Sequence, residues 1–348
     1  MRTLCVRCVP LFCLSVLSGL AQQPPQPPDR KIALAVVVTD KSGKPVSGLQ
    51  QSDFKLLDNK QPQNIVAFQA VNGATAGDVP VEIIFLSDEV NTAFTRVSFE
   101  RTQIAKFLQS QEGELPRPAS LAFLTDAGIK IDNISTTDGK ALVADLDRNR
   151  AGLRSINRDQ GFYGATDRVG LSLNALQQLA AYEMPRPGRK IVIWISPGWP
   201  FLTGPNEILT SKEQRTLFNQ IVAISDALRH AQVTLYSIDP LGTADAGGFR
   251  TFYYEQFVKG VKKPNQAQIG DLALQAIAVQ SGGRVLNSNN DLTSEMATAV
   301  GDANNFYVLT FNALPGDGPN EYHSLEIKLD KSGLKAFTRT GYYAQPER

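Results

Sequence analysis

Apolar runs alternate with helical patterns over residues 79–302, and this alternation constrains the fold more than any other feature of the chain. Residues 81–86 (VEIIFL) and 189–196 (RKIVIWIS) are almost wholly apolar, as expected of strands inside a sheet that is covered on both faces. Amphipathic helical spacing occurs over residues 98–108, 168–182 and 213–230. Strands that alternate with helices of this length pair in parallel, so this segment predicts an α/β domain with a doubly wound, mainly parallel sheet.

Short strand patterns lie on both sides of this segment. Those before it cover residues 31–39, 54–57 and 64–69; those after it cover 305–312, 322–329 and 335–340, with no helical pattern between them. Short strands separated by turn residues are typical of a β-sandwich. We predict that the two sets form one small β-sandwich into which the α/β domain is inserted. The alternative is a separate C-terminal β extension.

The N-terminus has the layout of a secretory signal peptide. Arg2 and Arg7 precede an apolar run over residues 9–17, and small residues lead to Ala21, after which we expect cleavage. The run is too short to cross a bilayer comfortably, so we predict an exported protein, periplasmic or extracellular, with no integral membrane span after cleavage. The predicted organisation is a signal peptide (1–21), a Pro/Gln-rich linker (22–30), N-terminal strands (31–75), the α/β domain (79–302) and C-terminal strands (303–343).

Composition excludes several classes of function. The three cysteines, at positions 5, 8 and 13, all lie in the predicted signal peptide, so the mature chain would have no disulfide and no Cys-ligated metal. Lys and Arg total 35 against 34 acidic residues, which gives no electrostatic basis for a nucleic-acid partner. The two histidines, His230 and His323, are far apart in the sequence and do not indicate a zinc site. No Gly-x-Ser-x-Gly, P-loop or dinucleotide-binding motif follows a strand.

Ligands of open parallel sheets bind at the carboxyl ends of the strands, so the loops there are the candidate binding surface. Aromatic residues follow the strand at 189–196, and a long connection over residues 241–264 contains more of them together with arginine. Such a composition is typical of interface cores. The alternative is that these side chains pack their loops onto the domain, and for Trp199 burial is favoured. The candidate partner-binding residues are Glu89, Asn91, Trp199, Phe201, Arg250, Tyr253 and Tyr254.

Several stretches together resemble a known family. They are VVVTDKSGKPVSGLQQSDFKLLDNK, IIFLSDEVNT, YSIDPLG, SGGRV, FYVLTF and TRTGYY, in that order along nearly the whole mature chain. The chain looks like a von Willebrand factor A domain, which has a Rossmann-like doubly wound sheet, and more closely like the VWFA-related family of exported proteins that is frequent in Acidobacteria. The resemblance implies a protein-binding module and the possibility of a metal-dependent adhesion site.

In von Willebrand A domains an Asp-x-Ser-x-Ser loop, a Thr from a second loop and an Asp before Gly hold Mg²⁺ through oxygen ligands. Carried over to this chain, the first motif retains Asp88 and Thr92, whereas Val90 replaces a hydroxyl. Thr166 matches the second loop, and Pro197 stands where the third loop has its carboxylate. Two interpretations remain open: a weak, degenerate site for Mg²⁺ or another divalent cation, and a vestigial loop in which Asp88 caps a turn.

Three functions follow from these patterns. The first is an exported, non-enzymatic module that binds an unidentified protein or peptide. The second is a structural or assembly subunit of a cell-envelope complex, which uses the β-sandwich for its contacts. The third and weakest is a hydrolase with a carboxylate pair such as Asp88 with Asp126 or Asp239, which would need two carboxyl groups with separated pKa values in one pocket.

Overall fold

The computed structural model describes residues 30–73, 79–110, 113–149, 161–199, 209–240, 253–287 and 289–347. The contacts within residues 31–348 join them into one compact unit. The predicted signal peptide and nearly all of the predicted linker lie outside the described residues, as do Phe201 and Arg250.

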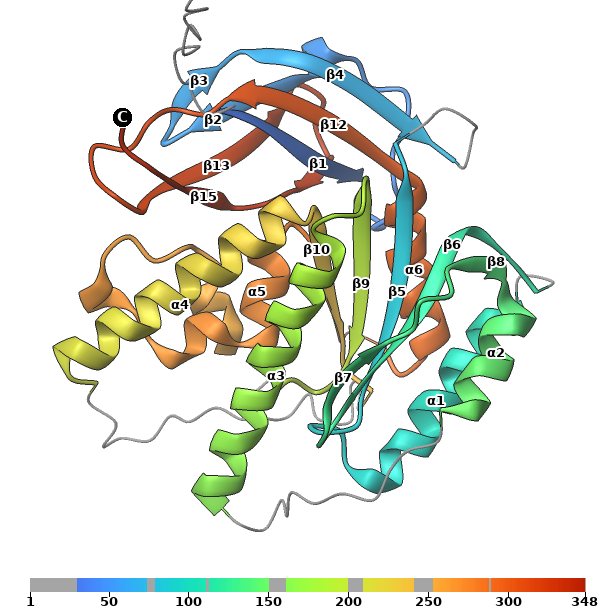
Figure 1. Ribbon diagram of the computed structural model, residues 1–348. Coiled ribbons are helices and arrows are strands. Elements are labelled where there is room, and N and C mark those ends of the chain that lie inside the picture. Colours follow the sequence, from blue (N-terminus) through green and yellow to red (C-terminus); the bar gives the residue numbers. More distant parts are fainter. Residues whose placement is uncertain are drawn as a thin grey trace, which may run out of the picture. The chain divides into compact units, whose positions relative to one another are not determined.

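A mainly parallel sheet forms the centre of the α/β segment (Figure 1). Its strand order is β11-β10-β9-β5-β6-β7, with β8 also paired to β6. The neighbouring strands from β11 through β10, β9 and β5 to β6 all pair in parallel. Strands β7 and β8 pair with β6 in antiparallel orientation. The strands are β5 (Val81–Asp88), β6 (Glu114–Thr125), β7 (Gly128–Ile131), β8 (Thr136–Asp138), β9 (Arg189–Ile195), β10 (Val233–Ile238) and β11 (Val285–Leu286). The predicted doubly wound, mainly parallel sheet is confirmed.

Helices cover both faces of this sheet (Figure 1). On one face lie α1 (Phe94–Ser110), α2 (Gly139–Arg148) and α6 (Leu292–Asn304); on the other lie α3 (Gly161–Glu183), α4 (Ser211–His230) and α5 (Leu274–Gln280). Side-chain caps start several of them: Asp138 caps α2, Asp291 caps α6, and Thr210 forms a capping box with Glu213 at α4. Each layer buries its own apolar cluster against the sheet.

Two antiparallel four-stranded sheets form the β-sandwich, with strand orders β14-β1-β12-β4 and β15-β13-β2-β3. The strands are β1 (Lys31–Thr39), β2 (Phe54–Asp58), β3 (Gln61–Gln63), β4 (Ile65–Asn72), β12 (Asn305–Asn312), β13 (Glu321–Leu329), β14 (Lys335–Phe337) and β15 (Gly341–Ala344). Because β1 pairs with β12 and β2 pairs with β13, N- and C-terminal strands build both sheets. The predicted single sandwich is confirmed, and a separate C-terminal β extension is excluded.

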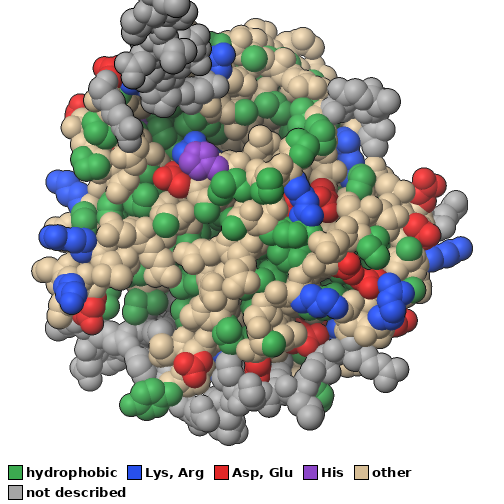
Figure 2. All heavy atoms as spheres, in the orientation of Figure 1, with side chains coloured by type: hydrophobic (Ala, Val, Ile, Leu, Met, Phe, Trp, Pro, Cys, Tyr) green, Lys and Arg blue, Asp and Glu red, His purple; other side chains and the backbone are tan. Residues whose placement is uncertain are grey.

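Short 3₁₀ helices complete the described elements: η1 (Gln51–Asp53), η3 (Tyr253–Phe257), η4 (Pro264–Gln266) and η5 (Ile269–Leu272). On the face of the molecule in Figure 2, basic and acidic side chains are interspersed. This distribution agrees with the near balance of 35 basic and 34 acidic residues.

Apolar side chains of the sandwich also belong to the cores of the α/β segment. Val37, Val71 and Phe306 join the cluster beneath α1, α2 and α6. Tyr322 and Tyr343 join the cluster on the opposite face, where the Tyr343 ring meets Phe218 edge to face at 5.9 Å. The sandwich and the parallel sheet are therefore packed layers with shared cores.

Candidate functional site

The carboxylate of Asp88, at the end of β5, is fully buried and receives four hydrogen bonds. Its Oδ1 accepts from the backbone N–H groups of Val90 (3.0 Å) and Asn91 (2.8 Å). Its Oδ2 accepts from the Asn91 side-chain amide (2.8 Å) and from the indole N–H of Trp194 (3.0 Å). A carboxylate has about four acceptor positions, so the chain's own donors satisfy this one.

Helix α3 contacts this network through Ser172. The Asn91 amide donates to the Ser172 hydroxyl (2.8 Å), which in turn donates to the carbonyl of Arg168 (2.8 Å). Thr166, the expected second-loop ligand, lies on the exposed surface of α3. The sequence placed the start of this helix near residue 168, but α3 begins at Gly161, so Thr166 falls in a helical turn instead of a loop.

The remaining residues of the loop after β5 are also buried. Glu89 forms an ion pair with Arg101 (3.1 Å), and Thr92 is 1% exposed. Glu100 of α1 lies beneath them and accepts from the Ser87 hydroxyl (2.9 Å). Burial raises the pKa of Glu100 well above 4.5, against the hydrogen bond from Ser87, because an ionised carboxylate is poorly solvated there. Three buried carboxyl groups therefore lie at this loop: Asp88 with its N–H donors, Glu89 with Arg101, and Glu100 with Ser87.

The carboxylate of Asp88 has no free acceptor position left for a divalent cation. Mg²⁺ requires near-octahedral oxygen ligands, whereas N–H donors occupy the oxygens of Asp88, and the buried Val90 has none to offer. The hydroxyl of Ser196, at the end of β9, accepts from the N–H of Gly198 (3.0 Å). No group of three or more His, Cys, Asp or Glu within the described ranges could hold a metal ion. The geometry supports the interpretation in which Asp88 caps a turn.

The predicted aromatic contacts divide into two groups. Trp199 is 5% exposed, donates its indole N–H to the Leu272 carbonyl (2.7 Å) and meets the Trp194 ring edge to face. Tyr253 and Tyr254 are half-buried in η3, and the Tyr253 ring lies 5.1 Å from that of Phe257. Tyr254 lines a groove on the surface. Among the aromatic residues proposed for partner binding that the structure describes, Tyr254 therefore lines a surface groove.

This groove, which we call the edge groove, has a volume of about 490 Å³ and lies where three strands meet. In the described part of the chain, β11 and β14 are outer strands of their sheets. Glu326 and Ile327 of β13 line the groove beyond the segment that β15 covers, which is Glu321–Ser324. Three strand edges without a second neighbour therefore border one recess, a feature that the sequence did not reveal because it depends on the order of the strands.

The edge groove combines apolar side chains with charged ones of both signs, namely Arg284, Lys335 and Glu326. The Phe337 ring lies between the guanidinium of Arg284 (4.9 Å) and the ammonium of Lys335 (4.7 Å). Arg284 is paired with the buried Asp302 (3.1 Å). Lys335 is exposed and has no carboxylate within ion-pair distance among the described residues. The groove can therefore accept an apolar side chain beside a negative charge.

One further cluster of titratable residues lies inside the β-sandwich. Asp58 accepts from the Tyr342 hydroxyl (2.6 Å) and lies 2.9 Å from His323 Nδ1. The exposed fractions of Asp58, His323 and Tyr342 are 0%, 4% and 3%. The cluster links β2, β13 and β15 through these contacts. A substrate could not reach such buried groups, so the cluster is not a candidate active site.

Comparisons with known proteins give neither a matching family model nor a similar curated protein. Solved structures with a similar arrangement include the PilB minor pilin from Streptococcus sanguinis (TM-score 0.35, 9% identity, 66% of this chain and 63% of that chain). Others are a von Willebrand factor type A protein from Catenulispora acidiphila (0.33, 10%, 86% and 76%) and the pilus adhesin SpaC from Lactobacillus rhamnosus GG (0.38, 10%, 93% and 43%).

This chain spans less than two thirds of the length of that pilin and of that adhesin. The strand order by itself defines the α/β fold with a doubly wound, mainly parallel sheet. Among the described residues, no helix combines the length and apolar character needed to cross a membrane.

Proposed function

We propose that this chain is an exported, non-enzymatic protein-binding module that holds an extended segment of its partner in the edge groove, without a metal ion. The observation that carries the proposal is the convergence of β11, β13 and β14 on one recess. A strand edge presents backbone donors and acceptors that an incoming extended peptide can pair with, and such pairing gives affinity while side-chain pockets give specificity.

The chemistry of the groove indicates the kind of segment. Phe337, Ile327 and Tyr254 offer apolar contacts, and Lys335 offers a positive charge that has no ion pair among the residues the structure describes. A partner strand with alternating apolar and acidic side chains complements both, because successive side chains of a strand point to opposite faces. The four donors to Asp88 support metal-independent binding, and they also leave that carboxylate without a free oxygen for the hydrolytic role considered from the sequence.

A selection experiment tests the proposal. The purified chain is immobilised and used to select from a phage-displayed library of random linear peptides, with EDTA present. Synthetic copies of enriched peptides are then titrated by fluorescence anisotropy against the wild type, Phe337→Ala and Lys335→Glu. We expect enriched peptides with alternating apolar and acidic residues, and at least ~10-fold weaker binding to each variant, because an apolar contact or a charge pair is lost.

Lys106→Glu provides the matched control, since Lys106 is exposed on α1 and does not line the groove. It should leave affinity unchanged. Equal affinity for the wild type and both groove variants would exclude the edge groove as the site. A strict requirement for Mg²⁺ would contradict the metal-independent mechanism.

A structural subunit of an envelope complex is the second candidate, and the same strand edges favour it, because subunits can also join by strand addition. Dissociation rates separate the two roles: a recognition module releases its peptide within seconds to minutes, whereas an assembly contact does not exchange over hours. Export is tested independently by sequencing the N-terminus of the protein recovered outside the cytoplasm, which we expect to begin at Gln22.

A further inference from the structure

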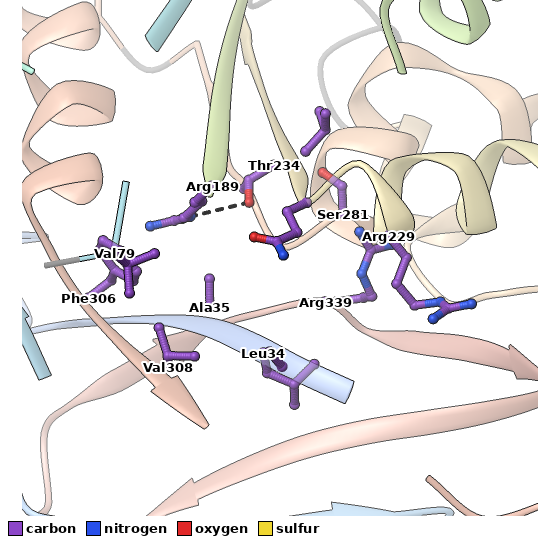
Figure 3. Close-up of a pocket in the computed structure, with 13 residues that line it drawn as sticks. Leu34, Ala35, Val79, Arg189, Arg229, Thr234, Ser281, Phe306, Val308 and Arg339 are labelled. Atoms are coloured by element: carbon purple, nitrogen blue, oxygen red, sulfur yellow. Dashed lines mark hydrogen bonds between the residues drawn. The ribbon is translucent and has the colours of Figure 1, made fainter. Parts of the chain in front are cut away.

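A second recess lies between the β-sandwich and the α/β layer, away from the edge groove. It has a volume of about 80 Å³ and is bordered by β1 and β12 on one side and by β9, β10 and α4 on the other. Figure 3 shows Leu34, Ala35 and Val308 along the sandwich side, Arg189 toward one end and Arg229 with Arg339 toward the other. We call this recess the arginine pocket.

Two of its guanidinium groups are buried and form no ion pair with a carboxylate in the described part of the chain. Arg189 is 4% exposed and Arg339 is 8% exposed, and neither has an ion pair among the described residues. Arg189 lies over the Phe306 ring (4.4 Å) and donates to the Thr234 hydroxyl (3.5 Å) and the Asp302 carbonyl (3.3 Å). Burial lowers its pKa, and the nearby Tyr236 and Asp302 partly oppose this. Arg339 donates to the Ser225 carbonyl at 3.5 Å.

Nearby carboxylates are engaged elsewhere. Asp226 pairs with Arg229 (3.2 Å). One oxygen of Asp302 accepts from Arg284 (3.1 Å) and from the Tyr236 hydroxyl (3.0 Å), whereas its other oxygen has no hydrogen bond within the described residues. Burial, and after it the charge of Arg229, lower the pKa of Arg339 to about 10, so this guanidinium still carries its positive charge at neutral pH. The pocket therefore has three arginines, of which Arg229 forms an ion pair with Asp226.

A buried charge without a counter-ion is unfavourable, and an anion placed beside it removes much of that cost. Most of the remaining lining is apolar, including Leu34, Val308 and Phe306, and Gln232, Thr234 and Ser281 add polar groups. The volume corresponds to about two to three water molecules, at ~30 Å³ each, or to a small organic acid. We propose that the arginine pocket binds a small carboxylate with a short apolar body, its carboxylate on Arg339 beside Arg229 and its alkyl part against β1 and β12.

Isothermal titration calorimetry with sodium propionate tests this site, with propionamide as the neutral molecule of the same shape. We expect propionate to bind the wild type with a dissociation constant on the order of 1 mM, and propionamide not to bind measurably. Arg339→Gln should weaken propionate binding by at least ~10-fold, because it removes a charge-assisted hydrogen bond. Arg215→Gln, which neutralises an exposed arginine of α4 outside the pocket, should leave the affinity unchanged.

A second variant keeps the test decisive if Arg339→Gln does not fold. Ala35→Leu fills the space beside β1 and retains every charge, so it should also abolish propionate binding. Equal binding of propionamide, or propionate affinity that both variants leave intact, would overturn the proposal. Binding of inorganic phosphate in preference to propionate would overturn the assignment to a carboxylate. None of these outcomes depends on the edge groove, so failure here does not affect the proposed peptide site.

Discussion

At Asp88 the chain stabilises a buried carboxylate with its own N–H groups. Two backbone amides, one side-chain amide and one indole surround the two oxygens. Hydrogen bonds to an ionised acceptor are stronger than neutral ones, and four of them together stabilise a carboxylate that has no ion pair within the described ranges. The donor from β9, Trp194, is the contact that also ties the loop after β5 to the neighbouring strand.

Removing that donor should be costly. We expect Trp194→Phe to lower the free energy of unfolding by ~1–3 kcal/mol beyond the cost of the smaller ring, because a buried carboxylate loses a hydrogen bond. Urea denaturation measures the change. Trp199→Phe is the matched control: its indole donates to a neutral carbonyl, so its loss should cost about 1 kcal/mol. If both variants cost the same, the charge on Asp88 is not what the indole stabilises.

Asp271 in η5 should make stability depend on pH. Burial raises its pKa from 3.8 to about 6, partly opposed by the hydrogen bond from the Gln268 N–H. The folded state therefore holds the proton more tightly than the unfolded state. The stabilisation is present below pH 3.8 and is lost as the pH rises through about 6.

Asp271→Asn should abolish this loss, because the neutral amide cannot ionise. We expect the wild type to lose stability relative to Asp271→Asn as the pH rises from about 4 to about 7, as measured by urea denaturation at a series of pH values. NMR titration of the Asp271 carboxyl should give a midpoint near 6. Parallel stability curves for the two proteins would contradict the raised pKa.

At the scale of the elements, the crossing from α5 to β11 depends on a glycine. A Cβ built at Gly283 would lie 1.9 Å from the Leu235 carbonyl oxygen of β10, which a real side chain cannot approach. Gly283→Ala should therefore lower the free energy of unfolding by ~3 kcal/mol or more, measured by urea denaturation. Gly318→Ala, where a Cβ meets nothing within 4 Å, should change it by less than ~0.5 kcal/mol. If Gly283→Ala were as stable as the wild type, the backbone between α5 and β11 could shift away from Leu235 at no cost, against the prediction.

The sequence predicted which elements exist better than it predicted where they begin and end. Long apolar runs such as β5 and β9 and the spacing of α4 were recognisable because burial on one or both faces imposes a period. The strand expected over residues 335–340 ends at Phe337 as β14, and a further strand in the other sheet, β15, begins at Gly341 beyond the predicted range. The chain changes sheets at Gly341, where a Cβ would lie 2.3 Å from the Tyr322 hydroxyl, a contact that no local pattern encodes.

The candidate site was predictable in part. Asp88, Asn91 and Thr92 lie together in the loop after β5, as expected from the strand that precedes them. Trp194, which donates to Asp88, lies 106 residues from it in the chain, and Ser172, which accepts from Asn91, lies 81 residues from that residue. Both contacts depend on how helix α3 and strand β9 dock against the loop. The edge groove and the arginine pocket arise from tertiary order alone, which is why neither had a signature in the sequence.

At the scale of the whole molecule, the sandwich and the parallel sheet share their apolar cores. Val37 and Phe306 of the sandwich pack with Phe85 and Met296, and Tyr343 packs with Phe218. Separating the layers would expose these side chains to water, at roughly 25 cal/mol per Å² of apolar surface. A free α/β segment would therefore be much less stable than the same segment with the sandwich attached.

We therefore expect residues 31–348 to unfold in one cooperative transition, although the α/β segment interrupts the sandwich in sequence. Differential scanning calorimetry should give a calorimetric enthalpy equal to the van't Hoff enthalpy. Phe306→Ala, at the shared core, should lower the melting temperature of the whole transition without splitting it, because cavity formation costs ~3–5 kcal/mol. Tyr163→Ala, on an exposed side chain of α3, is the control and should change it little. Two separate transitions in the wild type would show instead that each layer is stable without the other.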